Sequence, residues 1–204
     1  SDNQATTVTV IKRMVLKSVF IGWSFVVVDA AVADMKKVLA DGGIYTLSND
    51  MEGDFVVSAT TPVTVKLNGH KITNKASDTF TVNHGSSLTI EGEGIVDNVT
   101  HARACIYNNG KVLLNGGTYT RSLENGQSDT NAGGNSYYNI LNHGEMTINQ
   151  SVSVSQSGKF SSMIASGYYD YSNTNPRNGH VEGTNAAAPK LTINGGTFSG
   201  DLIR

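Results

Sequence analysis

The stretch Val63-Thr-Val-Lys-Leu-Asn-Gly-His-Lys-Ile72 carries a pattern that recurs along the chain. It places apolar residues two positions apart, follows them with Asn and Gly, and ends on another strand-forming residue. Four later stretches share these features, namely Leu88–Ile95, Val112–Tyr119, Met146–Val152 and Leu191–Phe198. Alternating apolar residues predict a short strand with one buried side, and Asn-Gly predicts a turn. A strand and turn that return at regular spacing are typical of a solenoid, in which neighbouring windings cover each other.

The spacing of the copies gives the length of one winding. The second apolar residues of the five copies are Val65, Ile90, Leu114, Ile148 and Ile193. The first two intervals define a winding of about two dozen residues, and the next two are longer by about ten and about twenty residues. This excess predicts insertions near 123–135 and 168–189. We therefore expect residues 44–204 to form an all-β, right-handed parallel β-helix of about five coils with a continuous dry interior.

A second repeated corner supports the same winding. Val82-Asn-His-Gly85, Tyr107-Asn-Asn-Gly110 and Leu141-Asn-His-Gly144 each precede a copy by a short step of one or two residues. Gly and Asn suit such corners because they tolerate a positive φ. We interpret His84 and His143 as polar turn residues rather than ligands of one metal ion, because two coils separate them by about 10 Å.

Composition narrows the classes of protein to consider. The chain has 204 residues, a formal net charge of -2 at pH 7, and 22 glycines against 3 prolines. A near-neutral charge without a basic run argues against nucleic-acid binding. Cys105 is the single cysteine, so the chain has no internal disulfide. Its strand-like surroundings favour a small core residue.

Residues 1–28 differ from the repeats and form the first predicted unit. A basic pair, an apolar run and Ala31-Val32-Ala33 imitate a secretory signal, but Lys17 interrupts the apolar run. The run is also shorter than the roughly 20 residues that a membrane span needs. We interpret the segment as two strands, Val8–Ile11 and Val15–Val28 in pieces, that serve attachment or assembly. Its candidate partner-binding residues are Val8, Val10, Phe20, Trp23 and Phe25.

Residues 29–43 are predicted to hold a helix that caps the first coil. Asp29 can act as its N-cap, and two glycines follow its end. Three apolar residues share one face, namely Val32, Met35 and Leu39. An amphipathic helix at this point can cover the open apolar end and the free edge of a solenoid.

Catalysis on such a scaffold would need acids gathered on one face, as in carboxylate-dependent hydrolases or calcium-dependent lyases. The acidic candidates of one coil are Glu91, Glu93 and Asp97. We interpret the two glutamates as solvated corner residues, since Asn68 and Asn115 occupy nearby positions in neighbouring coils. Arg103 and Arg121 are expected at the surface. The sequence predicts no catalytic residue, no metal site and no cofactor.

The second insertion is the best candidate for ligand binding, because solenoids place variable chemistry on loops. Its candidate contact residues are Tyr168, Tyr169, Tyr171, Arg177 and His180. Tyrosine joins a flat apolar face to a polar tip, which suits stacking on sugar rings or on another protein. The alternative is that these tyrosines pack the loop onto its own rod. Both interpretations stay open.

The run Ile44-Tyr-Thr-Leu47, the repeat at 65–73 and the Leu-Thr-Ile-Asn-Gly-Gly-Thr-Phe of 191–198 resemble parallel β-helix proteins of phage virions. They are similar to head fibres and capsid decorations of tailed phages, and similar repeats occur in bacterial adhesins. The resemblance covers about residues 35–204 and carries over no catalytic residue. It implies a non-enzymatic virion protein that is anchored to the major capsid protein or another virion protein. Its β-helix would project outward to meet host-surface or mucus glycans.

Two other functions remain open at this point. A secreted bacterial adhesin at the cell surface would have a mature N-terminus cleaved at Ala33. A polysaccharide lyase or hydrolase would need a groove with several carboxylates near one sugar. A fibre can be a homotrimer, although the spacing does not require one. Neither a membrane span nor a nucleic-acid partner is expected.

Overall fold

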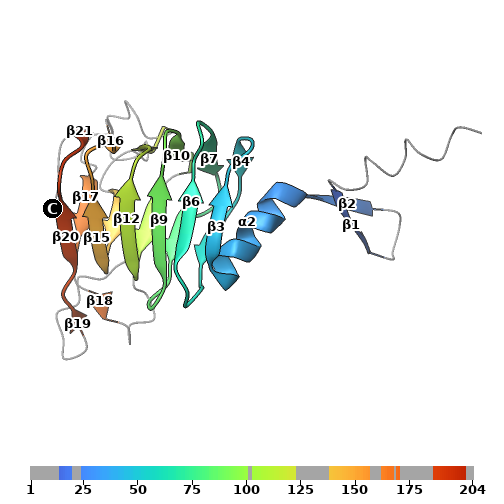
Figure 1. The fold of residues 1–204 in the computed structure, drawn as a ribbon, viewed down its shortest axis with the longest axis horizontal. Helices are drawn as coiled ribbons and strands as arrows, with labels where there is room; N and C mark the ends of the chain where they lie inside the picture. Colours follow the sequence, from blue (N-terminus) through green and yellow to red (C-terminus); the bar gives the residue numbers. More distant parts are fainter. Residues whose placement is uncertain are drawn as a thin grey trace, which may run out of the picture.

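The computed structural model describes residues 14–19, 24–100, 103–122, 138–156, 162–167, 169–170 and 186–200, with only the backbone of 14–29, 169–170 and 186–187. Within these residues, strands dominate and form three parallel sheets of five or six strands beside one short helix. The strands stack along a common axis (Figure 1). The predicted all-β class is confirmed.

Each turn of the chain adds one strand to each sheet. Sheet I consists of β3 (Gly43–Thr46), β6 (Val63–Lys66), β9 (Ser87–Glu91), β12 (Lys111–Asn115), β15 (Glu145–Ile148) and β20 (Lys190–Ile193). Sheet II consists of β4 (Met51–Glu52), β7 (Lys71–Asn74), β10 (Ile95–Asn98), β13 (Thr118–Thr120), β16 (Ser153–Gln156) and β21 (Thr197–Gly200). Sheet III consists of β5 (Phe55–Val57), β8 (Phe80–Val82), β11 (Ile106–Asn108), β14 (Tyr138–Asn142) and β17 (Ser162–Ser166). The chain therefore visits sheets I, II and III in order before it returns to sheet I, which is the path of a solenoid.

The predicted anchors lie in register. They occupy one continuous position of sheet I, namely Val65, Ile90, Leu114, Ile148 and Ile193. Tyr45 of β3 pairs with Val65, so sheet I has one strand before the first quoted repeat. We call the strands that one turn of the chain adds to the three sheets a level, so that β3, β4 and β5 form the first level. Adjacent strands of a sheet lie about 4.8 Å apart, so equivalent side chains of neighbouring levels are in contact.

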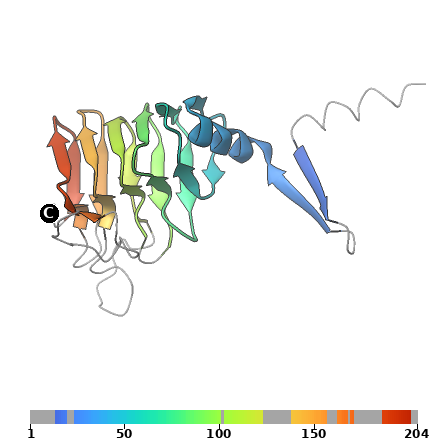
Figure 2. The same cartoon turned by 90° about the horizontal axis from the view of Figure 1, so that it is seen from below.

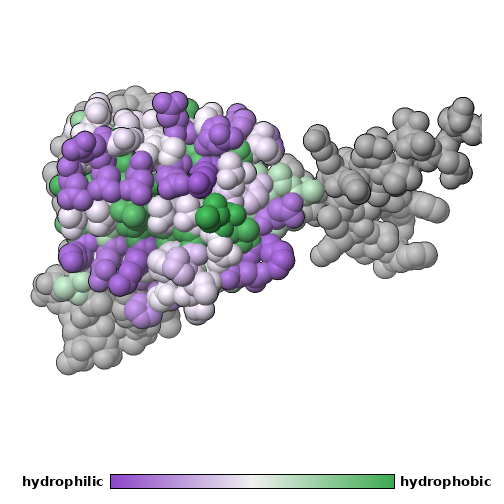
Figure 3. Space-filling model, in the orientation of Figure 1, coloured by the Kyte–Doolittle hydropathy of each residue, from purple (hydrophilic) through white to green (hydrophobic). Residues whose placement is uncertain are grey.

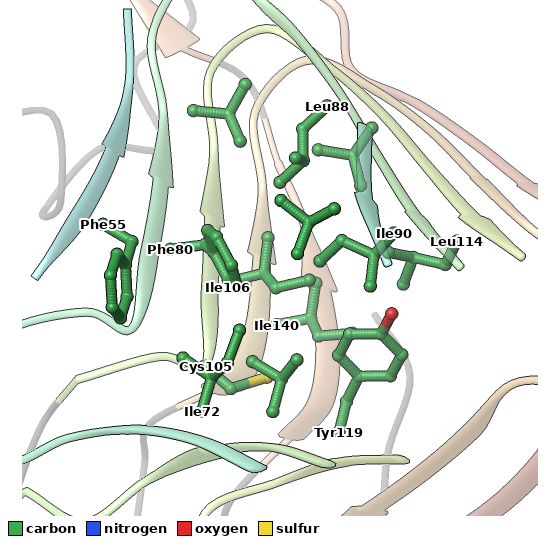
Figure 4. Close-up of a cluster of buried hydrophobic side chains, with 14 of the residues drawn as sticks. Phe55, Ile72, Phe80, Leu88, Ile90, Cys105, Ile106, Leu114, Tyr119 and Ile140 are labelled. Atoms are coloured by element: carbon green, nitrogen blue, oxygen red, sulfur yellow. The ribbon is translucent and has the colours of Figure 1, made fainter. Parts of the chain in front are cut away.

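A hydrophobic interior runs through the three sheets (Figure 4). Phe55 and Phe80 occupy one register position of sheet III, and their ring centroids lie 5.7 Å apart. Cys105 is fully buried in the same core, as predicted. Burying one large apolar side chain contributes about 1.5–3 kcal/mol to folding, so the stacked levels stabilise one another.

One anchor departs from the expectation of a dry interior. The first four anchors are fully buried, whereas Ile193 is 41% exposed. Ile193 lies on β20, which ends sheet I, and no further strand of the described residues stacks on it. Side chains inside a stack are covered by both neighbouring levels, so an outermost level keeps only half of that cover.

Helix α2 (Ala30–Asp41) lies across the other end of the stack (Figure 2). Its Met35 and Leu39 are fully buried. The backbone carbonyl of Leu39 accepts hydrogen bonds from the N–H groups of Ser58 and Ala59 at 3.0 and 3.1 Å. These two residues directly follow β5, so the helix end is bonded to the first turn of sheet III as well as packed on it. The helix lies where the sequence predicted it.

Two antiparallel strand pairs lie outside the three sheets. β1 (Met14–Val19) pairs with β2 (Ser24–Asp29), and together they extend one residue beyond each end of the predicted segment Val15–Val28. β18 (Tyr169–Asp170) pairs with β19 (Ala186–Ala187) between β17 and β20. The predicted strand Val8–Ile11 lies outside the described residues. Among the helices of the described part, none is long and apolar enough to cross a membrane.

Candidate functional site: a corner groove between sheets III and I

A pocket of about 300 Å³ opens where the chain turns from sheet III into sheet I. It is built by three stacked corners, each of which connects a strand of sheet III to the next strand of sheet I. Its described lining consists of His84, Gly85, Ser86, Ser87, Asn109, Gly110, Lys111, His143, Gly144, Glu145 and Ala188. We call this pocket the corner groove. A concave pocket on a rigid scaffold with a few converging polar groups is typical of a ligand-binding site.

Asparagine side chains hold the stacked corners together. Asn108 and Asn142 occupy one register position, and the Asn108 Nδ2 donates to the Asn142 Oδ1 at 2.7 Å. The Asn108 Oδ1 accepts from the Gly110 N–H at 2.9 Å, and the Asn142 Oδ1 accepts from the Gly144 N–H at 3.2 Å. Each asparagine thus fixes its own turn and bonds to the next level. This explains the Asn two residues before Gly110 and Gly144, whereas Asn108 pairs with Val82 and not with Asn83 at the level before.

The corner glycines allow the levels to approach closely. A Cβ atom at Gly110 would collide with the carbonyl oxygens of Asn83 and Ser86, and one at Gly144 would collide with that of Gly110. Any larger residue at either position would have to push backbone aside. The groove floor is therefore backbone, and its polar side chains come from the flanking positions.

The corner side chains have different surroundings, and only Asn109 and His143 are equivalent in register. Four residues connect β8 to β9, whereas two residues connect β11 to β12 and β14 to β15. His84 is exposed, whereas Asn109 and His143 are buried. The His143 Nδ1 lies 2.9 Å from the Gly167 carbonyl oxygen, and its ring meets the ring of Tyr107 edge-on at 5.8 Å. His143 is therefore a packed, hydrogen-bonded residue, while His84 presents its imidazole to solvent at the groove.

Charged residues border the groove along sheet I. Ser87, Lys111, Glu145 and Lys190 share one outward register position, which we call the groove-side column. The Lys111 Nζ and Glu145 Oε2 lie 3.4 Å apart across two levels. Both side chains are more than half exposed, so their mutual attraction is weak and either group can turn to a ligand.

Both ends of the second predicted insertion are fixed beside the groove. The Gly167 N–H donates to the Asn142 carbonyl at 3.0 Å, and the Lys190 N–H donates to the Gly144 carbonyl at 2.9 Å. Ala188 itself lines the groove. The segment 168–189 therefore starts and ends beside the corner groove.

The sequence-predicted ligand residues lie almost wholly outside the described residues. This holds for Tyr168, Tyr171, Arg177 and His180, while Tyr169 is described only as a backbone position of β18 paired with Ala187. The predicted partner-binding residues Val8, Val10, Phe20 and Trp23 also lie outside them, and Phe25 is described only as the strand partner of Ser18. These assignments stay predictions.

The acidic candidates of the third level are not gathered at one place. Glu93 is exposed, and Glu91 forms an ion pair with Lys66, with 3.2 Å between the Nζ and Oε1 atoms. Asp97 is fully buried on sheet II. It accepts from the Ser122 N–H at 2.8 Å, from the Ser122 Oγ at 2.6 Å and from the Lys71 Nζ at 2.9 Å. Over the described part of the chain, no group of three or more His, Cys, Asp and Glu side chains could hold a metal ion.

The expectation that Arg121 lies at the surface is wrong, because Arg121 is fully buried, while Arg103 is partly exposed. Arg121 follows β13 directly and precedes Ser122, whose contacts with Asp97 are given above. Burial removes water from this polar cluster, so the pKa of the neighbouring Cys105 thiol rises, first through desolvation and then through the negative charge of Asp97. Sequence spacing gave no signal of this cluster because its members come from different levels.

Comparison of the chain with protein-family models, with curated proteins and with solved structures finds no match.

Proposed function

We propose that this chain is a non-enzymatic binding protein built on a right-handed parallel β-helix of about five coils, and that the corner groove binds carbohydrate. The observation that carries the proposal is the placement of the groove. It lies on a rigid scaffold, is bordered by an exposed imidazole and a solvent-exposed lysine–glutamate pair, and is framed by both ends of the tyrosine-bearing insertion.

A carbohydrate suits these groups for a chemical reason. Sugar hydroxyls both donate and accept hydrogen bonds, and the groove offers donors at Lys111 and His84, an acceptor at Glu145 and a hydroxyl at Ser87. A charged pair that is exposed can hydrogen-bond a neutral ligand without leaving an unpaired charge behind. Tyrosines of the insertion would add a flat apolar surface over the sugar rings.

Titration calorimetry with a panel of short oligosaccharides tests this proposal. We expect His84→Ala with Lys111→Ala to weaken binding about tenfold or more, because each lost hydrogen bond to a charged group is worth about 1.5–3 kcal/mol. Lys66→Ala is the matched control, since Lys66 forms a similar inter-level pair with Glu91 away from the groove lining. Equal affinities for the two variants and the original chain would refute the groove as the site.

The sequence resemblance supports a virion as the place of action. In this proposal residues 1–28 attach the protein, as a single chain or a homotrimer, to the major capsid protein or another virion protein. The 204-residue protein with Phe20→Asp and Trp23→Asp should then fail to assemble onto undecorated capsids while it still binds sugar. Retained assembly would reject residues 1–28 as the attachment segment.

The same material separates the two alternatives. A secreted adhesin would be isolated with an N-terminus that starts after Ala33, which mass spectrometry detects. A polysaccharide lyase or hydrolase would release oligosaccharides from a polysaccharide panel, and such release would contradict the non-enzymatic proposal.

A further inference from the structure

The outward face of sheet I carries a stripe of threonines and large aliphatic residues along the whole stack. One residue of each strand contributes to the same register position, namely Ile44, Thr64, Thr89, Leu113, Thr147 and Thr192. We call this set the threonine stripe. Figure 3 shows pale and apolar surface over sheet I between two hydrophilic rows. Because parallel strands repeat at about 4.8 Å, the stripe presents chemically similar groups at equal intervals.

The threonine hydroxyls of the stripe are available to a ligand. All four threonines are partly exposed, and within the described residues none of their hydroxyls is bonded to another protein group. Other threonine hydroxyls of the body are engaged, such as that of Thr79, which donates to the Asp97 carbonyl at 2.7 Å. Each stripe threonine therefore offers a methyl group and a free hydroxyl. The methyl groups, together with Leu113 and Ile44, form the apolar part of the stripe.

The rows on either side of the stripe are polar but nearly neutral. The groove-side column holds the Lys111–Glu145 pair, and the opposite column holds the Lys66–Glu91 pair. The opposite column continues as an amide ladder, in which the Asn194 Nδ2 donates to the Asn149 Oδ1 at 2.9 Å. Each carboxylate faces a lysine, and Lys190 adds one positive charge to the groove-side column. The charges therefore largely cancel, and the face attracts neither polyanions nor polycations strongly.

We propose that the threonine stripe binds an extended, neutral, linear polysaccharide that runs along the axis of the stack, and this inference rests on carbohydrate binding at the corner groove. A β-linked glycan ribbon has apolar C–H faces and hydroxyl edges. Its C–H face fits the methyl groups of the stripe, and its edges reach the hydroxyls, amides and charged pairs of the two columns. The groove-side column also lines the corner groove, so one ligand chain can contact both surfaces.

Two observations favour a polysaccharide over a protein partner. Binding energy in protein interfaces concentrates in Trp, Tyr and Arg, and the stripe contains none of these. A regular surface also gains most from a regular ligand, because each added repeat of the ligand meets another equivalent level without a new cost of association.

The experiment measures affinity by calorimetry for a length series of linear, neutral, β-linked glucose oligomers and for a carboxylated series of matched lengths. We expect affinity to rise about tenfold or more from the shortest to the longest neutral oligomer, and to rise less in the carboxylated series. Thr89→Val with Thr147→Val should lower affinity for the longest neutral oligomer about tenfold while affinity for the shortest stays unchanged. Thr118→Val, on the outward face of sheet II, is the control and should change neither.

The outcomes separate the two proposals. Binding of short oligomers with no gain on lengthening, or no effect of the threonine substitutions on the longest oligomer, would overturn the stripe and leave the groove. Absence of binding to every oligomer would overturn the groove and the stripe together. A stronger response to the carboxylated series would overturn the assignment of a neutral ligand.

Discussion

The outward faces of sheets I and III are made by the same turns of the chain, yet the face of sheet I meets solvent and the face of sheet III is buried at its later levels. In sheet I, β9 and β12 alternate between buried inward and half-exposed outward residues. In sheet III, β11 is buried throughout, and β14 and β17 nearly so. Repetition of the strand therefore does not repeat its surroundings.

The change can be followed along one outward register position of sheet III. Val56 is 40% exposed and Thr81 is half-buried, but Tyr107, Leu141 and Ala165 are 6%, 3% and 7% exposed. The last three pack together with Ala104 and Tyr138 as a second hydrophobic cluster. Sheet III thus has cores on two sides at its later levels, while sheet I keeps an open face on which a ligand can lie.

Leu141→Asp should have the largest effect on stability and tests whether the outward face of sheet III is buried at its later levels. A carboxylate in the second cluster loses the apolar burial of Leu141 and is poorly hydrated, so we expect a loss of about 4 kcal/mol or more in the free energy of unfolding. Leu113→Asp, at the outward position of sheet I, should cost about 1 kcal/mol or less. Denaturant titration of both variants measures the difference, and equal losses would show that the two faces are alike.

Asp97→Ala should have the next largest effect. It compares a buried carboxylate of sheet II with the half-exposed carboxylate of Glu91 on sheet I. Its removal leaves Ser122 and Lys71 without their buried acceptor, so we expect a loss of about 2–4 kcal/mol. Glu91→Ala, which breaks the half-exposed pair with Lys66, should cost about 1 kcal/mol or less. Thermal or chemical unfolding of the two variants checks this, and a cost for Asp97→Ala no greater than for Glu91→Ala would contradict it.

The pH dependence of stability sharpens the comparison by reporting on the interior. Burial raises the pKa of the Cys105 thiol above its ordinary value of 9.0. The folded state then keeps a proton that the unfolded state has lost, so stability present below pH 9 declines as pH rises further. One such group contributes up to about 1.4 kcal/mol per pH unit.

Cys105→Ala should flatten this decline, which unfolding titrations at a series of alkaline pH values measure. The comparison concerns the slope with pH, because the substitution also changes packing. Tyr119 is likewise buried with a raised pKa, so part of the decline should remain in the variant. An identical slope in the variant and the original chain would mean that the thiol is not the titrating group.

The two exposed lysine–glutamate pairs should show the smallest effect. Lys111→Ala and Lys66→Ala each remove one inter-level ion pair on sheet I, and both should change stability by about 0.2–1 kcal/mol. Their difference should appear only in binding of short oligosaccharides, where Lys111 lies at the groove. A large loss of stability in either variant would show that this face is less solvated than its exposure indicates.

Some features of the second cluster had a sequence signal that simple alternation does not capture. Ile106-Tyr107, Ile140-Leu141 and Ile164-Ala165 place two apolar residues side by side at the same register positions. Adjacent apolar residues in a strand indicate burial on both faces. Leu113-Leu114 has the same pattern, but Leu113 is half-exposed, so the signal alone does not tell which face is covered.

Only part of the corner groove could be predicted from the sequence. The repeated Asn-His-Gly and Asn-Asn-Gly corners indicated stacked turns, and the anchor spacing indicated extra residues after the last of them. The sequence did not separate the exposed His84 from the buried His143, because the two Asn-His-Gly corners look alike although the β8–β9 connection is two residues longer. The difference lies in the length of the corner and in Tyr107 and Gly167, which contact His143 from other levels of the stack.

The sequence alone determined the repeat, the strand positions, the inward anchors and the helix at one end. These depend on local periodicity, which states how a side chain points relative to its own strand or helix. Only the tertiary structure decided that Arg121 is buried, that Ile193 is partly exposed, and that the outward faces of sheets I and III differ. Exposure depends on which distant residues lie over a side chain, and the pattern within one strand carries no information about them.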